Sequence, residues 1–295
     1  MRRILSALLL LTILSLSARS QDMKQIREQG AKDEVDFKTY PYGNNKAAGK
    51  YFNIRGIKMY CEVYGEGQPL LFIHGNGGSI RSFLYQIGYF SQHYKVIVAD
   101  SRNQGKSYDN SDSLTYEMMA DDYSALLDSL KTGPAYVVGW SDGGIEGLLL
   151  AIRHPEKVKK LAVTGANLVP DSSAVPQEIW DMVMPEYNQL KAKPNLSIPE
   201  KRGLKLLRLL VEQPHIPLSD LHKISCPTLV IGGDHDVIKT EHTMLIAKNI
   251  SQSYLWILPG SGHSTPVVYK DEFNKKVDQF FSSDYRKIEK EDRFF

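Results

Sequence analysis

Cysteine is scarce in this sequence, and neither sign of charge is in clear excess. Only two of the 295 residues are cysteines, Cys61 and Cys226, so disulfides cannot be what stabilises a chain of this length. The 36 basic and 34 acidic residues leave a formal net charge of +2, which does not indicate the clustered basic face of a nucleic-acid binder. Hydrophobic residues make up 42% and charged residues 24%, which excludes disordered and collagen-like chains and predicts a globular protein.

Metal and nucleotide motifs are also missing. The sequence has no H-E-x-x-H motif and no histidine pair at metal-binding spacing. Residues 105–107 read GKS, as at the end of a phosphate-binding P-loop, but Asp100 stands where that motif requires its first glycine. We therefore expect neither a metal nor a cofactor, and no nucleic acid as a partner.

A hydrophobic run at the N-terminus has the pattern of a cleaved secretory signal. Arg2 and Arg3 form a basic start, residues 4–16 are mostly apolar, and residues 18–20 place small residues at a cleavage site. The run is shorter than the roughly 20 apolar residues of a membrane span. We therefore expect residues 1–20 to direct export to the periplasm or the cell exterior, without a stable membrane anchor. The alternative is an uncleaved N-terminal anchor.

Beyond the signal, strand-like and helix-like segments alternate. Residues 21–49 are polar and predict a linker or surface arm. Short apolar runs predict buried strands, and amphipathic stretches between them predict helices. Such alternation is typical of a mostly parallel α/β sheet with helices on both faces. Strands are expected at 51–54, 57–64, 69–73, 94–99, 135–138, 158–163, 228–231 and 254–258, and helices at 80–90, 114–130, 143–154, 241–249 and 271–281.

Residues 168–222 interrupt this alternation. The segment carries no strand pattern and many prolines, which separate helical pieces at 177–190 and 200–212. We expect a helical cap over the catalytic edge of the sheet. The core would then comprise residues 50–167 and 223–282, followed by a charged tail at 283–295.

The strongest functional pattern is G-x-S-x-G at residues 139–143, between a predicted strand and a predicted helix. A nucleophile elbow lies between a strand and a helix in this way. Its turn is so tight that bulky neighbours of the serine would clash, which explains the glycines at residues 139 and 143. The turn raises the hydroxyl of Ser141 above the sheet, at a helix N-terminus that favours developing negative charge. Ser141 is therefore the candidate nucleophile.

A serine is a poor nucleophile unless a base accepts its proton and a carboxylate orients that base. Two loops after the cap carry these residue types. Asp234 and Asp236 follow one predicted strand, and His263 follows the next. His263 is the candidate base, and either aspartate is a candidate to orient it.

These motifs, in this order, resemble the α/β-hydrolase family over residues 51–281. Residues 100–107 read DSRNQGKS and are similar to the family's D-x-R-G-x-G-x-S loop, with Asn103 in place of a glycine. We interpret that departure as structural drift. The resemblance implies an eight-stranded sheet flanked by helices, with a small helical cap.

The resemblance also implies roles for individual residues. Asp236 fits the family's G-x-x-D spacing and would be the acid, with Asp234 as the fallback. Residues 72–78 read FIHGNGG and resemble the family's His-Gly turn, which donates one N–H to the oxyanion hole. The implied donors are the backbone N–H groups of Asn76 and Asp142.

A closer resemblance is to the valacyclovir hydrolase (biphenyl-hydrolase-like) group, carried by residues 139–145, 165–167 and 271–275. Those enzymes cleave α-amino-acid esters, and the acidic residue after the nucleophile holds the substrate's ammonium group. That position is Asp142 here. The alternative for Asp142 is a charge that only satisfies the helix dipole.

Five further residues have weaker assignments. Trp180 and Met184 are candidates to line the substrate pocket, and the alternative is that they form the apolar stripe of a cap helix. His74 is expected to support its turn rather than take part in chemistry. Cys61 and Cys226 are expected to be two buried thiols, because their strands are not neighbours in the family's sheet.

The sequence thus predicts an exported serine hydrolase that cleaves small carboxylic esters, among them α-amino-acid esters. Ser141, Asp236 and His263 would form the triad and pass through an acyl-enzyme. The alternatives are an amide or C–C bond hydrolase of the same fold, or a non-catalytic binding protein.

Overall fold

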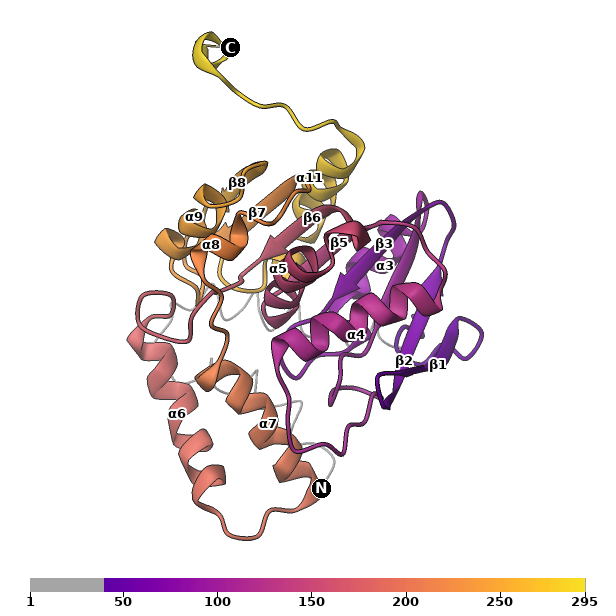
Figure 1. Ribbon diagram of the computed structural model, residues 1–295, viewed down its shortest axis with the longest axis vertical. Helices are drawn as coiled ribbons and strands as arrows, with labels where there is room; N and C mark the ends of the chain where they lie inside the picture. The colour runs from indigo at the N-terminus through magenta and orange to yellow at the C-terminus, as the bar shows by residue number, and fades with distance from the viewer. Residues whose placement is uncertain (1–39, 295) are drawn as a thin grey trace. The chain divides into compact units, whose positions relative to one another are not determined.

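Eight strands form one sheet in the computed structural model, which describes residues 40–294. The strand order is β1-β2-β4-β3-β5-β6-β7-β8. β1 pairs antiparallel with β2, β2 pairs antiparallel with β4, and every later pairing is parallel. This confirms the predicted eight-stranded, mostly parallel sheet (Figure 1). The strands are β1 (Gly49–Ile54), β2 (Ile57–Tyr64), β3 (Gln68–Ile73), β4 (Tyr94–Ala99), β5 (Ala135–Trp140), β6 (Val158–Thr164), β7 (Thr228–Gly233) and β8 (Ser253–Leu258).

Helices cover both faces of the sheet, as the apolar character of the strands predicts. Alternate residues of β3 show this directly, because Leu71 and Ile73 lie in one hydrophobic cluster and Leu70 and Phe72 in the other. The first cluster includes buried residues of α4, α5 and α9, and the second includes residues of α3 and α11. These helices are α3 (Leu84–Phe90), α4 (Tyr116–Ser129), α5 (Asp142–Arg153), α9 (Thr240–Lys248) and α11 (Lys270–Ser282). The short elements are η2 (Ile80–Phe83), η3 (Pro155–Lys157), α10 (Thr265–Val268) and η4 (Lys290–Phe294).

The segment before β1 is attached to the sheet where the structure describes it. Glu62 of β2 is fully buried, and its carboxylate accepts hydrogen bonds from the backbone N–H groups of Gly43 (2.8 Å) and Asn45 (2.9 Å). Such bonds to a buried charge are among the stronger ones in proteins. The end of the predicted arm is therefore docked. The predicted signal at 1–20 and the rest of the arm, up to residue 39, lie outside the described residues.

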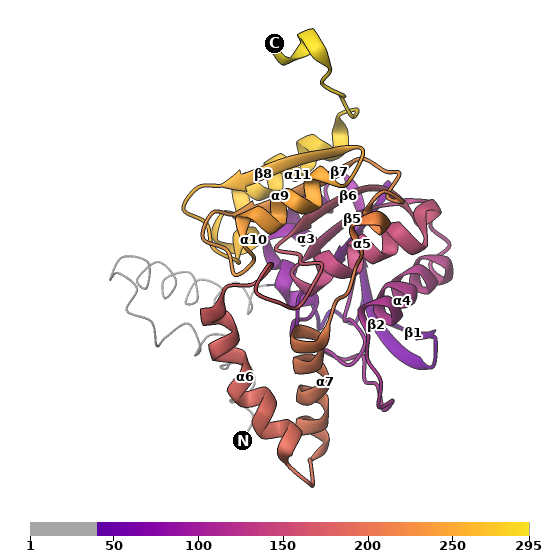
Figure 2. The same cartoon turned by 60° about the vertical axis from the view of Figure 1, so that its left-hand side comes forward.

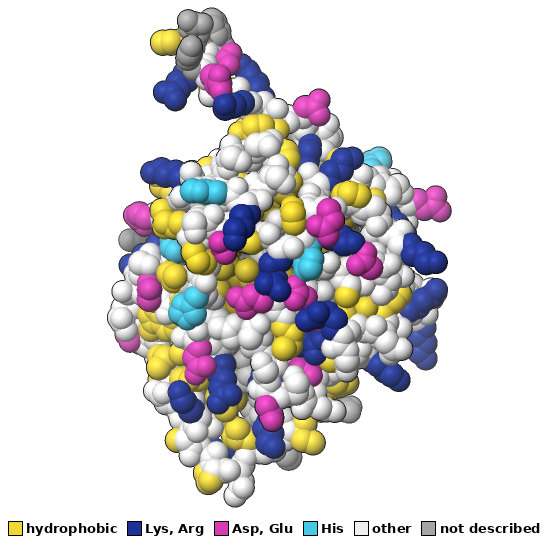
Figure 3. Space-filling view, in the orientation of Figure 1, with side chains coloured by type: hydrophobic (Ala, Val, Ile, Leu, Met, Phe, Trp, Pro, Cys, Tyr) yellow, Lys and Arg dark blue, Asp and Glu magenta, His cyan; other side chains and the backbone are white. Residues whose placement is uncertain are grey.

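The insertion between β6 and β7 is helical, and no strand occurs between positions 168 and 222. It contains α6 (Gln177–Ala192), α7 (Ile198–Glu212) and the short α8 (Leu218–Leu221). Figure 2 shows α6 and α7 side by side as a hairpin that extends away from the sheet. Only Tyr187 of α6 is fully buried. Acidic and basic side chains are interspersed over the face seen in Figure 3.

Helix α7 attaches the cap to the core through the loop after β4. Arg202 donates to the carbonyl of Asn103 (3.0 Å), and the Asn103 amide donates to the carbonyl of Arg202 (3.2 Å). Asn103 has a φ of 65°, in the left-handed region, where glycine is favoured and asparagine is tolerated. The replacement of the family's glycine is therefore not mere drift, because this side chain joins the loop to the cap.

Cys61 of β2 and Cys226, just before β7, are both buried free thiols, as their distant strands predict.

Between positions 40 and 294, no helix is long and apolar enough to cross a lipid bilayer.

Candidate active site

Ser141 occupies a strained turn between β5 and α5. Its φ is 59° and its ψ is −122°, a backbone conformation that L-residues rarely adopt. Such strain costs on the order of 1–3 kcal/mol and is found mainly at functional sites. A Cβ atom on Gly143 would lie 1.9 Å from the carbonyl oxygen of Ile73, and one on Gly139 would lie 2.1 Å from that of Gly143. Both glycines of the motif are therefore required by backbone contacts.

Ser141, His263 and Asp236 form a continuous hydrogen-bond chain. The Ser141 Oγ lies 2.9 Å from Nε2 of His263, and Nδ1 of His263 lies 2.6 Å from Oδ1 of Asp236. A carboxylate can only accept, so Nδ1 carries the proton and Nε2 is left to accept from the serine hydroxyl. The three residues follow β5, β8 and β7, whose parallel pairing brings their carboxyl ends to one edge of the sheet.

Asp234, the fallback acid, does not contact His263. Its Oδ1 accepts from the Ser261 backbone N–H (3.1 Å) and lies 2.8 Å from Nδ1 of His235. Its side chain is 36% exposed, whereas that of Asp236 is fully buried. Asp234 therefore supports the loop that carries the histidine.

Electrostatics favour an ionised Asp236 beside His263. Burial raises the pKa of the Asp236 carboxyl, but the adjacent His263 and backbone N–H donors such as that of Ile238 together outweigh burial, so the pKa lies below its ordinary value. Burial lowers the pKa of His263, but the charge of Asp236 and its hydrogen bond outweigh this, so the pKa lies above its ordinary value. An ionised Asp236 at this position would stabilise an imidazolium on His263.

The turn after β3 passes directly beside the serine. A Cβ on Gly75 would lie 2.9 Å from the Cβ of Ser141. The buried His74 holds this turn, because its Nδ1–H donates to the Gly75 carbonyl (2.8 Å) and its Nε2 accepts from the Ser101 N–H (3.0 Å). Across residues 40–294, no acceptor is bonded to the backbone N–H of Asn76.

Asp142 begins α5, so its N–H has no acceptor within the helix. Asp142 directly follows Ser141, and Asn76 directly follows Gly75, which lies beside Ser141. The two N–H groups therefore remain candidate donors of an oxyanion hole, which requires two donors directed at one oxygen.

The side chain of Asp142 makes a contact that the sequence does not reveal. Its Oδ2 accepts from the Asn76 amide (2.8 Å), and the same amide nitrogen donates to the carbonyl of Leu206 in α7 (3.1 Å). Asp142 is 1% exposed, and burial raises its pKa to about 6 although the Asn76 hydrogen bond opposes this. The carboxylate thus links the elbow to the oxyanion turn and, through Asn76, to the cap.

Glu146, one turn further along α5, was not singled out from the sequence. It is fully buried, and within the described part of the chain neither carboxylate oxygen has a hydrogen-bond partner. Burial, together with the charges of Asp142 and Asp122, raises the pKa of Glu146 well above its ordinary value. Burial and the neighbouring carboxylates therefore both disfavour the charged form of this carboxyl.

Trp140, directly before the nucleophile, is a second residue that the motif reading missed. Its indole N–H donates to the carbonyl of His263 (2.8 Å). The bond holds the backbone of the histidine loop against the end of β5. The sequence signal was its place as the first variable position of G-x-S-x-G, where a large hydrogen-bonding side chain can reach a neighbouring loop.

The two candidate pocket residues lie on α6. Trp180 is half-buried and packs on a small cluster formed by Ala174, Val175 and Ile238. Ile238 is two residues beyond Asp236, so the indole lies beside the loop that carries the acid. Met184 is half-buried four residues further on, on the same helix face. Their role in substrate binding stays a prediction.

Comparison with known proteins identifies the family of the chain. A family described as "alpha/beta hydrolase fold" matches residues 68–221. The chain belongs to the alpha/beta hydrolase fold family. Among curated relatives of this chain, the "Serine hydrolase BPHL" of Homo sapiens is 26% identical over 246 residues, covering 77% of this chain and 84% of that protein. A "Putative carbamate hydrolase RutD" of Azorhizobium caulinodans is 32% identical over 247 residues, covering 74% and 93%.

Solved structures show the same fold. The enol-lactonase from Burkholderia xenovorans LB400 superposes with a TM-score of 0.69 at 20% identity, over 79% of this chain and 100% of that chain. At this identity the likeness establishes the architecture. Function has to be argued from the site itself.

Proposed function

We propose that this member of the family is a serine hydrolase of small carboxylic esters. The observation that carries the proposal is the hydrogen-bond chain from Ser141 through His263 to Asp236, with distances of 2.9 and 2.6 Å. These distances lie within the reach that proton transfer requires. The proposal includes export, which rests on residues 1–20 alone.

In the proposed reaction the Ser141 Oγ attacks the acyl carbon while Nε2 of His263 takes the hydroxyl proton. The carbonyl oxygen becomes an oxyanion held by the N–H groups of Asn76 and Asp142, and one such donor is worth roughly 3–4 kcal/mol of barrier. His263 then protonates the leaving alcohol, and the acyl group stays on Ser141. A water molecule activated by His263 releases the acid and restores the serine.

The pH dependence of this reaction follows from His263. The imidazole must be neutral to accept the serine proton, and its pKa lies above 6.5 because Asp236 outweighs burial. We expect kcat/KM for p-nitrophenyl acetate to rise with pH, with a midpoint above 6.5. Asp142→Asn should lower that midpoint, because the Asp142 charge also raises the pKa of His263. Initial rates from pH 5 to 9 test this, and a wild-type midpoint below 6.5 contradicts it.

The substrate class depends on whether Asp142 can reach a ligand. Its carboxylate is bonded to Asn76 and only 1% exposed, so a substrate ammonium group does not reach it in this structure. The geometry supports simple esters rather than a selective enzyme for α-amino-acid esters.

Benzyl propionate and benzyl alaninate differ only in the α-amino group. We expect their kcat/KM values to agree within about fivefold, and Asp142→Asn to leave the ratio unchanged. A buried ion pair with Asp142 would instead favour the alaninate by about 30-fold or more. A preference of that size, lost in Asp142→Asn, would establish Asp142 as an ammonium anchor. If neither ester is cleaved, the ester proposal itself fails.

A second candidate is hydrolysis of a C–N bond. The observation that favours it is the 32% identity to a protein named as a putative carbamate hydrolase. The same triad serves ester and amide chemistry, so the fold does not decide between them. Turnover of p-nitroacetanilide at a rate comparable to p-nitrophenyl acetate would favour this candidate.

A further inference from the structure

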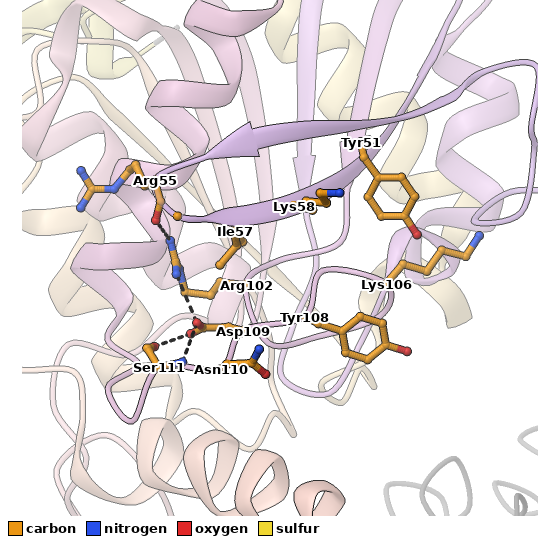
Figure 4. Close-up of a pocket in the computed structure, with 11 residues that line it drawn as sticks. Tyr51, Arg55, Ile57, Lys58, Arg102, Lys106, Tyr108, Asp109, Asn110 and Ser111 are labelled. Carbon is orange, nitrogen blue, oxygen red and sulfur yellow. Dashed lines mark hydrogen bonds and ion pairs between the residues drawn. The ribbon is translucent and has the colours of Figure 1, made fainter.

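A cavity of about 600 Å³ lies between the β1–β2 hairpin and the loop that follows β4. Its walls come from residues 51–58 and 102–111, and Ser141, Asp236 and His263 do not line it (Figure 4). Volumes between about 300 and 1,000 Å³ are typical of small-molecule sites. The cavity is therefore large enough for a ligand and separate from the proposed catalytic residues.

The basic side chains that line this cavity differ in whether they have an acidic partner. The guanidinium of Arg102 binds Asp122 (2.6 Å), and that of Arg55 lies 3.2 Å from the same carboxylate. Lys58 and Lys106 have no acidic partner within 4.0 Å anywhere in residues 40–294. The ammonium of Lys106 lies over the ring of Tyr60, 4.2 Å from its centroid, which is a cation–π contact and not an ion pair. The cavity thus carries two unpaired cations.

Asp109, the acidic residue that lines the cavity, already has a basic partner. Asp109 is buried, lies 3.5 Å from the guanidinium of Arg102, and accepts the backbone N–H of Ser111 (3.0 Å). Arg102 also donates to the carbonyl of Arg55 (3.0 Å), and Lys205 of α7 donates to the carbonyls of Asp109 (3.1 Å) and Ser111 (2.8 Å). This wall is held in place without a ligand, so binding would not require it to be ordered.

Two tyrosines stand exposed at the cavity. Tyr51 is 56% exposed and Tyr108 is 63% exposed. Figure 4 shows both rings and Lys106 on one side of the cavity, opposite Arg102 and Asp109. The guanidinium of Arg202 lies 4.4 Å from the ring centroid of Tyr108 and braces it from the cap. The ring of Tyr51 lies 5.1 Å from that of Tyr60, measured between centroids. Each ring is thus supported from within the protein, and its exposed part is available to pack against the body of a ligand.

We propose that this cavity binds a small organic anion with an aromatic or apolar body. Its carboxylate or phosphate group is attracted by Lys58 and Lys106, and its body packs against Tyr51 and Tyr108. The site is independent of the proposed hydrolysis, because it shares no residue with the triad. Its wall is joined to α7 through Lys205, so an occupied cavity contacts the segment that anchors the cap.

Calorimetric titration of the full chain tests this. Benzoate carries a carboxylate on a phenyl ring, and phenyl phosphate carries a phosphate on the same kind of ring. Benzyl alcohol is the neutral control, and inorganic phosphate is the control without a ring. We expect benzoate or phenyl phosphate to bind with a dissociation constant below about 1 mM, and benzyl alcohol to bind at least about tenfold more weakly. The tighter of the two anions identifies the headgroup.

Matched variants locate the binding. The double variant Lys58→Met and Lys106→Met should weaken binding of the anion by about tenfold or more. Tyr51→Ala should also weaken binding, although it does not change the charge of the cavity. Lys50→Met is the control, because Lys50 precedes Tyr51 on β1 and points to the opposite face. It should change binding by less than about twofold.

Three outcomes overturn the proposal. The first is that neither aromatic anion binds. The second is that the double lysine variant binds the anion as tightly as wild type does. The third is that Lys50→Met weakens binding as much as the double lysine variant does. Inorganic phosphate that binds as tightly as phenyl phosphate overturns the aromatic part. Because the readout is binding, these outcomes do not depend on ester turnover, and the unfolding temperature of each variant shows that it is folded.

Discussion

Ser141→Ala is expected to lower kcat/KM for p-nitrophenyl acetate by about 10⁴-fold or more, because the loss of a catalytic serine removes the covalent route. The chain from Ser141 to His263 is the feature that predicts this. Alanine keeps the same backbone restriction, so the fold should not change. The measurement is the initial rate with enzyme freshly separated from wild type.

Ser129→Ala provides the matched control for that variant. Ser129 is an exposed serine near the end of α4, and its hydroxyl bonds only the carbonyl of Ala125 (2.9 Å) among the described residues. Its loss should leave turnover within about twofold of wild type, as is usual for surface substitutions. If Ser141→Ala retains turnover while folded, Ser141 is not the nucleophile and the proposed function falls.

Asp236→Asn is the second substitution with a large expected effect. An amide in place of the carboxylate no longer stabilises an imidazolium and allows His263 the wrong tautomer, so kcat should fall about 10⁴-fold. The pKa of His263 should also fall, because Asp236 is what raises it above its ordinary value. Pre-steady-state rates and the pH profile of the residual activity measure both effects.

Asp234→Asn is the control for this second variant, because it makes the same chemical change two residues away. Asp234 contacts the Ser261 N–H and His235 rather than His263, so kcat should change by less than about threefold. The reverse ranking, with Asp234→Asn the more damaging, would make Asp234 the acid. Equal and small effects would show that no carboxylate orients the base.

Much of the fold was predictable because its strands are marked locally. An apolar run such as residues 94–99 reads as a buried strand whatever surrounds it, and β4 has these same bounds. The elbow is equally local, because Gly139 and Gly143 are needed by contacts within and just beside the turn. Helix ends were less well predicted, as α7 begins at Ile198 rather than at residue 200.

The candidate site was predictable as far as residue types and chain order reach. Ser141 directly follows one recognisable strand and His263 lies in the loop after another, and parallel strands bring such positions to one edge. The choice between Asp234 and Asp236 could be made from family spacing, but not from the physics of the local sequence. Both follow β7, and only the path of that loop decides which one faces His263.

By itself, the sequence determined the alternation of strands and helices, the position of the helical insertion and the choice of Ser141 as the candidate nucleophile. Each of these depends on periodicity or on a turn of a few residues. Tertiary structure alone decided that Asp142 bonds Asn76, that Asn76 reaches Leu206, and that Lys58 and Lys106 share a cavity. Such contacts join residues far apart in the chain, and their distances depend on how the sheet, the loops and the cap pack together.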